Sequence, residues 1–199
     1  MTDRWARLNP GRRQSSADGG AVTVSETASD GRAEVRVTVP DGWRLERLSL
    51  PEALSWLSVR NHADGIVFAQ RPDGRWEAHI IECKATVSDN AWRKARKQFL
   101  GTRVFADAVA GVTGISISDA ALYTAYRTSK IDPATSTDPI INVVPVGSAS
   151  TRRDDARYAG RVEWASDDII IDGFGRVPHR KLHLTLDEAG VGVGVLHLG

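Results

Sequence analysis

Two short stretches decide the fold of this chain: Asp64-Gly65-Ile66-Val67-Phe68 and His79-Ile80-Ile81-Glu82-Cys83-Lys84. Both are rich in β-branched and other apolar residues, which is typical of strands. Between them lies Arg71-Pro72-Asp73-Gly74, whose proline and glycine favour a tight turn. The sequence therefore predicts a β-hairpin over residues 64–84.

This hairpin brings charged side chains together. Successive side chains of a strand point to opposite faces, so Glu82 and Lys84 share one face while Ile81 and Cys83 share the other. Asp64 lies at the start of the neighbouring strand, and strand pairing brings its carboxylate close to that of Glu82. Two adjacent carboxylates repel each other unless a cation lies between them or one is protonated. Mg²⁺ prefers such oxygen ligands, so the pattern predicts metal-assisted chemistry on a phosphate, with Lys84 beside it.

The order of Asp64, a spacer of hairpin length and then Glu82-Cys83-Lys84 resembles the PD-(D/E)XK nuclease superfamily, over roughly residues 51–128. The resemblance implies a restriction-endonuclease-like fold. It implies Asp64, Glu82 and the backbone carbonyl of Cys83 as metal ligands and Lys84 as the catalytic lysine. It also implies Mg²⁺ or Mn²⁺ as cofactor and hydrolysis of phosphodiester bonds in nucleic acid, with DNA as the expected substrate.

Other interpretations of the same residues stay open. Ala63 stands before Asp64, where the family motif has proline. Glu82 and Lys84 could be an exposed pair on a sheet edge. The preceding Ile80-Ile81 instead favours a central strand, where charged side chains are costly unless they are paired or functional. The chain could also be a non-catalytic nucleic-acid-binding or assembly protein that retains a nuclease-like sheet. A third alternative is an accidental match within an unrelated α/β binding domain.

A basic helix is predicted directly after the hairpin. Ser88 or Asp89 can cap it, and Trp92, Ala95 and Phe99 recur at helical spacing. From position 84 to 103, six basic residues against one acidic residue give a local charge of +5. A solvated helix face usually mixes signs, so this pattern favours contact with a phosphate backbone. The residues predicted to bind nucleic acid are Arg93, Lys94, Arg96, Lys97 and Arg103.

Three further residues are candidates for accessory roles. Glu52 lies in the first turn of a helix predicted from Pro51 to about Asn61, and members of the resembled family often contribute an acidic residue from such a helix. Capping of the helix explains Glu52 equally well. His62 lies two residues before Asp64 and either faces the site or is a bystander. Gln98 resembles a polar residue that some family members place beside the active site.

Composition limits the class of protein. The chain has 199 residues, 41% of them hydrophobic and 26% charged, which is ordinary for one soluble domain. The net charge of +1 means that any basic surface is local. A single cysteine, no signal-peptide pattern and no long apolar run predict a cytoplasmic protein without membrane contact. A homodimer is left open.

The chain is expected to fold as an α/β (α+β) protein with a mixed central sheet flanked by helices. We expect a flexible N-terminal segment over residues 1–32, a nuclease-like core over 33–147 and a β-rich C-terminal extension over 148–199 packed on the same domain. Strands are predicted at 33–39, 122–128, 140–146, 168–172, 181–186 and 191–196.

Overall fold

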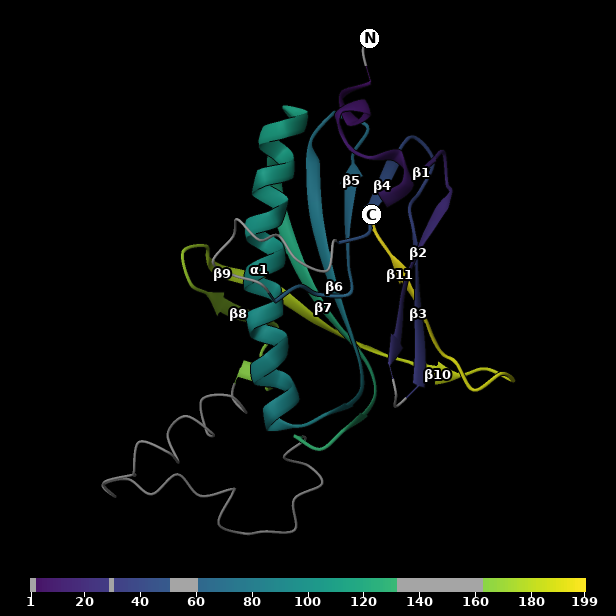
Figure 1. Ribbon diagram of the computed structural model, residues 1–199, viewed down its shortest axis with the longest axis vertical. Coiled ribbons are helices and arrows are strands. Elements are labelled where there is room, and N and C mark those ends of the chain that lie inside the picture. The colour runs from purple at the N-terminus through teal and green to yellow at the C-terminus, as the bar shows by residue number, and fades with distance from the viewer. Residues whose placement is uncertain (1–2, 29–30, 51–60, 132–162) are drawn as a thin grey trace.

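The computed structural model describes residues 3–28, 31–50, 61–131 and 163–199. In this part of the chain the protein has three layers: one long helix, a seven-stranded sheet and a four-stranded sheet. Figure 1 shows α1 against one face of the large sheet, with β2, β3 and β11 on the other side. The fold is thus mixed α/β and consists mostly of strands.

The predicted hairpin forms the centre of the large sheet. β5 (Gly65–Gln70) pairs antiparallel with β6 (Trp76–Val87), as expected from the sequence. β6 then pairs in parallel with β7, and the helix α1 connects these two strands. The strand order is β1-β4-β5-β6-β7-β9-β8. The remaining strands of this sheet are β1 (Arg13–Ala17), β4 (Arg44–Leu48), β7 (Ile117–Ser129), β8 (Asp168–Ile171) and β9 (Gly175–His183).

The helix α1 (Asp89–Thr113) begins where the predicted capping residue, Ser88, places its start. The Ser88 side chain accepts a hydrogen bond from the backbone N–H of Ala91, which satisfies a free donor of the first turn. Gly114 follows the helix in the left-handed conformation, with φ of 68°. Trp92 and Phe99 are buried against the large sheet, which confirms the predicted apolar stripe.

The small sheet covers the opposite face of the large one. Its strands are β2 (Ala21–Ala28), β3 (Gly31–Thr38), β10 (Thr185–Leu186) and β11 (Gly192–His197), in the order β10-β11-β3-β2. Val24 and Val35 pack with Ile81 between the two sheets, whereas Ile80 packs on the α1 side. The two neighbouring isoleucines of β6 therefore fill different cores, as strand alternation predicts.

The N-terminal segment is a correction to the prediction. Residues 13–17 and 21–28 are strands of the two sheets, and η1 (Arg4–Arg7) and η2 (Pro10–Arg12) precede them, so this part is not a flexible tail. The buried Trp5 packs against Phe68 and Trp76 at ring-centroid distances of 5.3 and 5.2 Å. Apolar burial and pairing to folded strands outweigh the polar composition on which the prediction rested.

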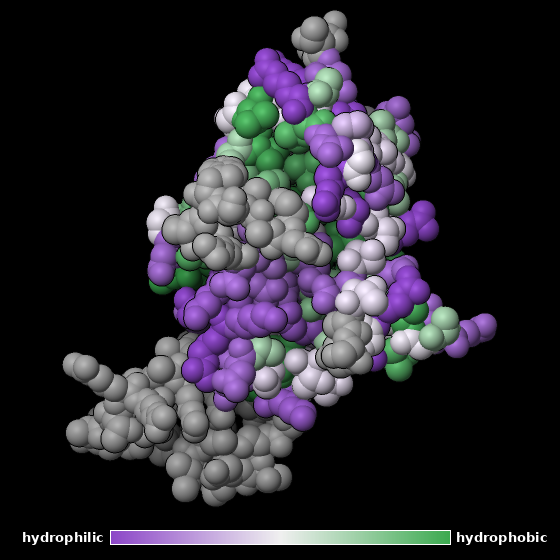
Figure 2. All heavy atoms as spheres, viewed as in Figure 1, coloured by the Kyte–Doolittle hydropathy of each residue, from purple (hydrophilic) through white to green (hydrophobic). Residues whose placement is uncertain are grey.

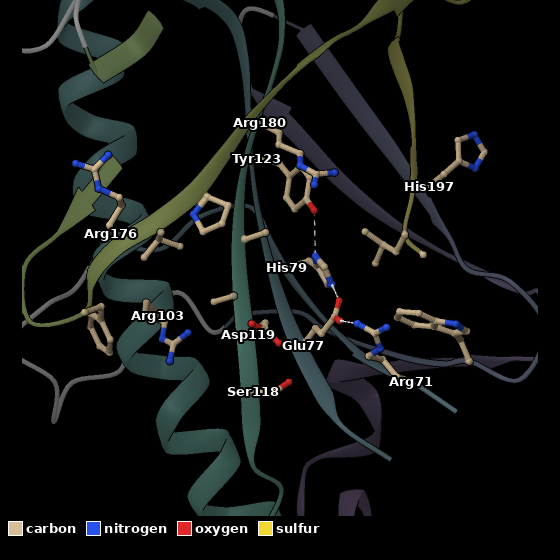
Figure 3. Close-up of a pocket in the computed structure, with 18 residues that line it drawn as sticks. Arg71, Glu77, His79, Arg103, Ser118, Asp119, Tyr123, Arg176, Arg180 and His197 are labelled. Carbon is tan, nitrogen blue, oxygen red and sulfur yellow. Dashed lines mark hydrogen bonds and ion pairs between the residues drawn. The ribbon is translucent and has the colours of Figure 1, made fainter. Parts of the chain in front are cut away.

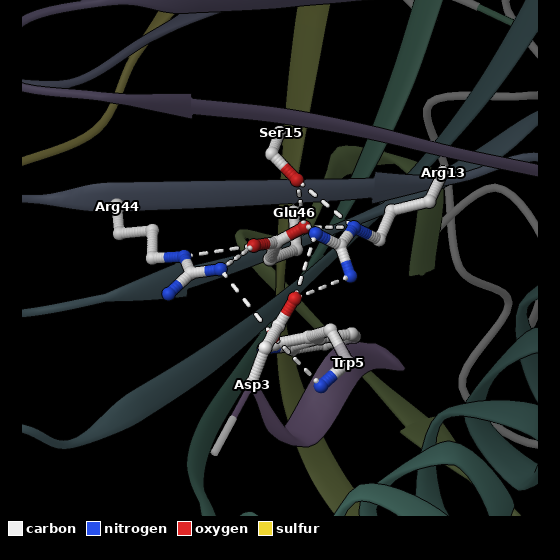
Figure 4. A network of polar contacts seen from close by, with 6 residues as sticks. All are labelled: Asp3, Trp5, Arg13, Ser15, Arg44 and Glu46. Carbon is white, nitrogen blue, oxygen red and sulfur yellow. Dashed lines mark hydrogen bonds and ion pairs between the residues drawn. The ribbon is translucent and has the colours of Figure 1, made fainter. Parts of the chain in front are cut away.

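A buried carboxylate anchors the same segment. Glu46 of β4 has no exposed side-chain surface and pairs with Arg44 at 2.6 Å and with Arg13 of β1 at 3.2 Å. It also accepts a hydrogen bond from Ser15 at 2.5 Å. Figure 4 shows how Asp3 closes this network, since its carboxylate contacts Arg13 while its other oxygen accepts from the backbone N–H of Trp5.

The C-terminal part is rich in strands, as predicted, and it completes both sheets. β9 joins the large sheet and β11 joins the small one. The predicted strand at 181–186 is divided, because β9 ends at His183 and β10 begins at Thr185. The helix predicted from Pro51 and the strand predicted at 140–146 lie outside the described residues, apart from Asn61.

Candidate functional site

The helix α1 fixes the loop that carries Asp64. The backbone N–H of Ala63 donates to Thr102 Oγ1 at 2.7 Å, and Gln98 Nε2 donates to the carbonyl of His62 at 2.8 Å. One oxygen of Asp64, Oδ2, then accepts a hydrogen bond from the backbone N–H of Cys83 on β6 at 2.6 Å. Asp64 and the centre of β6 are therefore joined directly, and Gln98 acts on the loop backbone.

Glu82 and Lys84 form a partly buried ion pair next to this junction. Glu82 has no exposed surface, and the Nζ of Lys84 contacts its Oε1. The second oxygen, Oε2, is buried and has no hydrogen-bond partner among the described residues. Burial of an unsatisfied carboxylate oxygen is costly. This atom is therefore a candidate ligand for a cation.

Glu26 of β2 is a member of this cluster that the sequence prediction missed. Burial, together with a hydrogen bond to Glu26, raises the pKa of Asp64 to about 8, against the opposing effects of the Cys83 N–H and the Lys84 ammonium. Lys84 thus acts on both Asp64 and Glu82. A signal for Glu26 exists in the sequence, because Val22-Thr23-Val24-Ser25-Glu26 alternates and places Glu26 on the inward face with the two buried valines.

Gly65 allows β2 to come this close. A Cβ atom at Gly65 would lie 2.6 Å from Cγ1 of the buried Val24, too near for any side chain. Because position 65 is glycine, the small sheet can pack on the start of β5 and bring Glu26 to Asp64.

The donor set of this cluster fits a hard cation. Glu26, Asp64 and Glu82 offer only carboxylate oxygens, which suit Mg²⁺ or Mn²⁺ with water and substrate as further ligands. Within residues 3–28, 31–50, 61–131 and 163–199, no three or more His, Cys, Asp or Glu side chains are arranged to hold a metal by themselves. Burial, followed by the charges of Asp64 and Glu26, raises the pKa of the Cys83 thiol, which disfavours the reactive thiolate form. The role of its backbone carbonyl as a ligand stays a prediction.

Two accessory candidates have different outcomes. Glu52 lies outside the described residues. The ring of His62 is half-buried, burial lowers its pKa, and neither ring nitrogen has a hydrogen-bond partner in the described part of the chain. His62 contributes its backbone carbonyl to Gln98, as described above.

A hollow of about 280 Å³ opens beside Glu26 and Lys84. Among the described residues that line this hollow, Glu26 is the one acidic residue. The basic lining residues come from four different helices and strands. They are Arg32, Lys84, Lys94 and Arg127. Such an excess of positive charge next to carboxylates suits a phosphate group that shares a cation with them.

The basic face of α1 adjoins the same region. Four of the five predicted residues, Arg93, Lys94, Arg96 and Lys97, line one surface hollow of about 630 Å³. Figure 2 shows the hydrophilic patch over the lower half of α1. Arg93 donates to Asn90 and Arg96 pairs with Glu163 at 2.9 Å, whereas Lys94 and Lys97 are exposed.

Arg103 lies elsewhere. It pairs with Asp107 at 3.2 Å, and its guanidinium lies 5.0 Å from the ring centre of Phe174 in the turn between β8 and β9. It lines a different pocket from the other four residues.

Comparison of the chain with protein-family models, with curated proteins and with solved structures finds no match. In the described residues, no helix is both long enough and apolar enough to cross a membrane. The functional assignment therefore depends on the chemistry of the cluster around Asp64.

Proposed function

We propose that this chain is a metal-dependent nuclease with a restriction-endonuclease-like core, acting on nucleic acid, with DNA as the expected substrate. One observation carries the proposal. Asp64, Glu82 and Glu26 gather around Lys84, a Glu82 oxygen is buried without a partner in the described structure, and a cation-lined hollow opens beside them. An acidic cluster of this kind costs stability, and a bound cation would offset that cost.

In this proposal Asp64 and Glu82 would hold Mg²⁺ or Mn²⁺, and the ion would supply Lewis-acid chemistry to a phosphoryl oxygen and to a bound water. The hydrogen bond from the Cys83 N–H orients the Asp64 carboxylate. Lys84, kept in place by Glu82, stabilises the negative charge that grows on the phosphate during attack by water. Without a cation, the raised pKa of Asp64 keeps a proton on this carboxyl group, which makes a hydrogen bond with Glu26.

The basic residues position the substrate. Lys94 lines the hollow beside Lys84 and also the hollow on the α1 face, so a nucleic-acid strand can run from one to the other. Contacts to phosphates carry no sequence information, and affinity that depends on them falls steeply with salt.

The experiment is a cleavage assay on labelled single- and double-stranded DNA and RNA, with Mg²⁺, Mn²⁺ or EDTA. We expect cleavage with either metal and none with EDTA. Asp64→Asn and Lys84→Ala should each lower the rate by about a hundredfold or more. Asp41→Asn and Arg36→Ala, exposed residues remote from the cluster, are matched controls and should cleave normally. Undiminished cleavage by Asp64→Asn would contradict the proposal.

A second candidate is a nucleic-acid-binding or assembly protein without catalysis. The exposed Lys94 and Lys97 favour it, because a basic helix face binds phosphates whether or not the acidic cluster is active. Salt-sensitive binding of DNA with no cleavage in either metal would support this candidate over the nuclease.

A further inference from the structure

A second pocket, with a volume of about 610 Å³, lies at the other end of the sheet. β7 and β9 begin to pair only at Leu122 and His179, so residues 117–121 of β7 are paired on the β6 side alone within the described chain. The pocket opens into the gap that the diverging strands leave, as Figure 3 shows. Its volume is that of a site for a small organic ligand.

One wall of the pocket is a chain of polar contacts. Arg71 Nη1 donates to Glu77 Oε1 at 3.0 Å, Glu77 Oε2 lies 3.3 Å from His79 Nε2, and His79 Nδ1 lies 3.1 Å from the Tyr123 hydroxyl. Figure 3 shows the four side chains in line along this wall. The Glu77 carboxylate is therefore neutralised by its neighbours.

Arginines on the other walls leave the pocket with an excess of positive charge. Arg180 is exposed and has no hydrogen bond or ion pair with any described residue, although its charge acts on Tyr123. Arg176 is 70% exposed, pairs with Asp168 at 2.7 Å and retains further donors. The other acidic lining residue is Asp119, which is exposed and interacts with Arg75.

Two guanidinium groups add flat surfaces. Arg71 lies 5.4 Å from the ring centre of Trp43, and Arg103 lies 5.0 Å from that of Phe174. A planar guanidinium held over an aromatic ring can stack a further ring on its free side. The pocket thus combines donors for an anion with platforms for a planar group.

We propose that this pocket binds a nucleotide through its phosphate monoester, with Arg176 and Arg180 as phosphate ligands and with the base stacked on Arg71 or Arg103. The phosphate monoester can belong to a free nucleotide or to the 5′-phosphorylated end of a nucleic acid. This inference does not depend on the proposed nuclease, because the pocket shares no lining residue with the hollow beside Lys84.

The test measures binding to the full chain by calorimetry, with inorganic phosphate, AMP, adenosine and a short oligonucleotide with or without a 5′ phosphate. We expect AMP to bind more tightly than phosphate or adenosine. Arg180→Ala and Arg176→Ala should each weaken AMP binding by about tenfold or more, as expected for a charge-assisted hydrogen bond. Arg36→Ala, an exposed arginine on the small sheet, should leave binding unchanged.

The outcomes distinguish a free nucleotide from a 5′-phosphorylated strand end, and they distinguish this inference from the proposed nuclease. If the protein prefers the 5′-phosphorylated oligonucleotide and Arg180→Ala loses this preference, the ligand is the 5′ end of a nucleic-acid strand. If both oligonucleotides bind equally and AMP binds tightly, the ligand is a free nucleotide. Lys84→Ala should retain AMP binding even where it abolishes cleavage. Binding of neither AMP nor the 5′-phosphorylated oligonucleotide up to about 1 mM, or equal binding by Arg180→Ala and wild type, would overturn the inference.

Discussion

Among single residues, Gly65 sets how closely the two sheets approach each other. Replacing it with alanine places a methyl group against the buried Val24, so either the side chain or the strand must shift. We expect Gly65→Ala to lower the free energy of unfolding by about 1–3 kcal/mol, the usual cost of overpacking a core. Urea denaturation measures this difference.

A glycine of α1 provides the control. A Cβ at Gly111 meets nothing within 4 Å, and alanine favours a helix, so Gly111→Ala should be neutral or stabilising. If Gly65→Ala were as stable as wild type, the conclusion that β2 packs closely on β5 at this position would be wrong.

Asp64 carries a cost in stability that depends on pH. Its pKa is 3.8 in a model peptide and about 8 in the folded chain, so above pH 4 the unfolded state loses a proton that the folded state retains. Stability from this group is therefore lost as pH rises from about 4 to 8. The amide introduced by Asp64→Asn cannot titrate, so we expect this variant to be more stable than wild type by up to about 5 kcal/mol at pH 8 and nearly equal to it at pH 4.

Thermal unfolding of metal-free protein at the two pH values measures this effect. Asp41→Asn, at an exposed site, should show no such pH-dependent gain. A gain for Asp64→Asn that is equal at both pH values would mean that charge burial is not its cause.

At the scale of elements, α1 both supports the Asp64 loop and presents the basic face. Lys94→Glu and Lys97→Glu leave the buried stripe of α1 intact, so they should fold normally and bind nucleic acid more weakly. The salt dependence should also become shallower, by about one in the log–log slope for each lost phosphate contact. Fluorescence anisotropy with labelled DNA across a salt series measures both quantities.

Arg36→Glu reverses a charge on the small sheet, away from α1, and serves as the control. If Arg36→Glu weakened nucleic-acid binding as much as the lysine substitutions do, the weaker binding would result from the change in net charge and not from the α1 face.

The first strand depends on a different element, because β1 is tied to β4 through Glu46. Glu46→Gln removes the charge that Arg13 and Arg44 share, and we expect it to cost about 2 kcal/mol of stability, since the carboxylate is fully buried. Glu34→Gln breaks an ion pair with Arg32 whose partners are 58% and 38% exposed, so its cost should be below about 0.5 kcal/mol. Equal costs for the two variants in urea denaturation would contradict the anchoring role of Glu46.

Local sequence patterns predicted the strands and the helix around the site. They did not predict the contacts between residues that are far apart in the sequence. The turn residues and alternation of residues 64–84 were sufficient for the hairpin, and Ser88 was sufficient for the start of α1. The place of β1 and β2 in the sheets depends on partners such as Glu46 that no local pattern reveals. Glu26 was missed for the same reason, because its contact with Asp64 joins two strands that are far apart in the chain.

At the scale of the whole molecule, the second sheet changes how the site is built. The large sheet and α1 alone would hold Asp64, Glu82 and Lys84. The small sheet adds Glu26 from one side, and β3 with β7 adds Arg32 and Arg127 to the adjoining hollow. Strands of both sheets therefore shape one region around Cys83 and Lys84 of β6.

The most direct test of this account is the cleavage of a 5′-labelled duplex DNA by wild-type protein and by Asp64→Asn, each with Mn²⁺ and with EDTA. We expect products only for wild type with Mn²⁺, and no products for the variant although it is at least as stable. Cleavage by Asp64→Asn at the wild-type rate, or cleavage that persists in EDTA, would contradict the assignment of Asp64 and its neighbours as the catalytic centre.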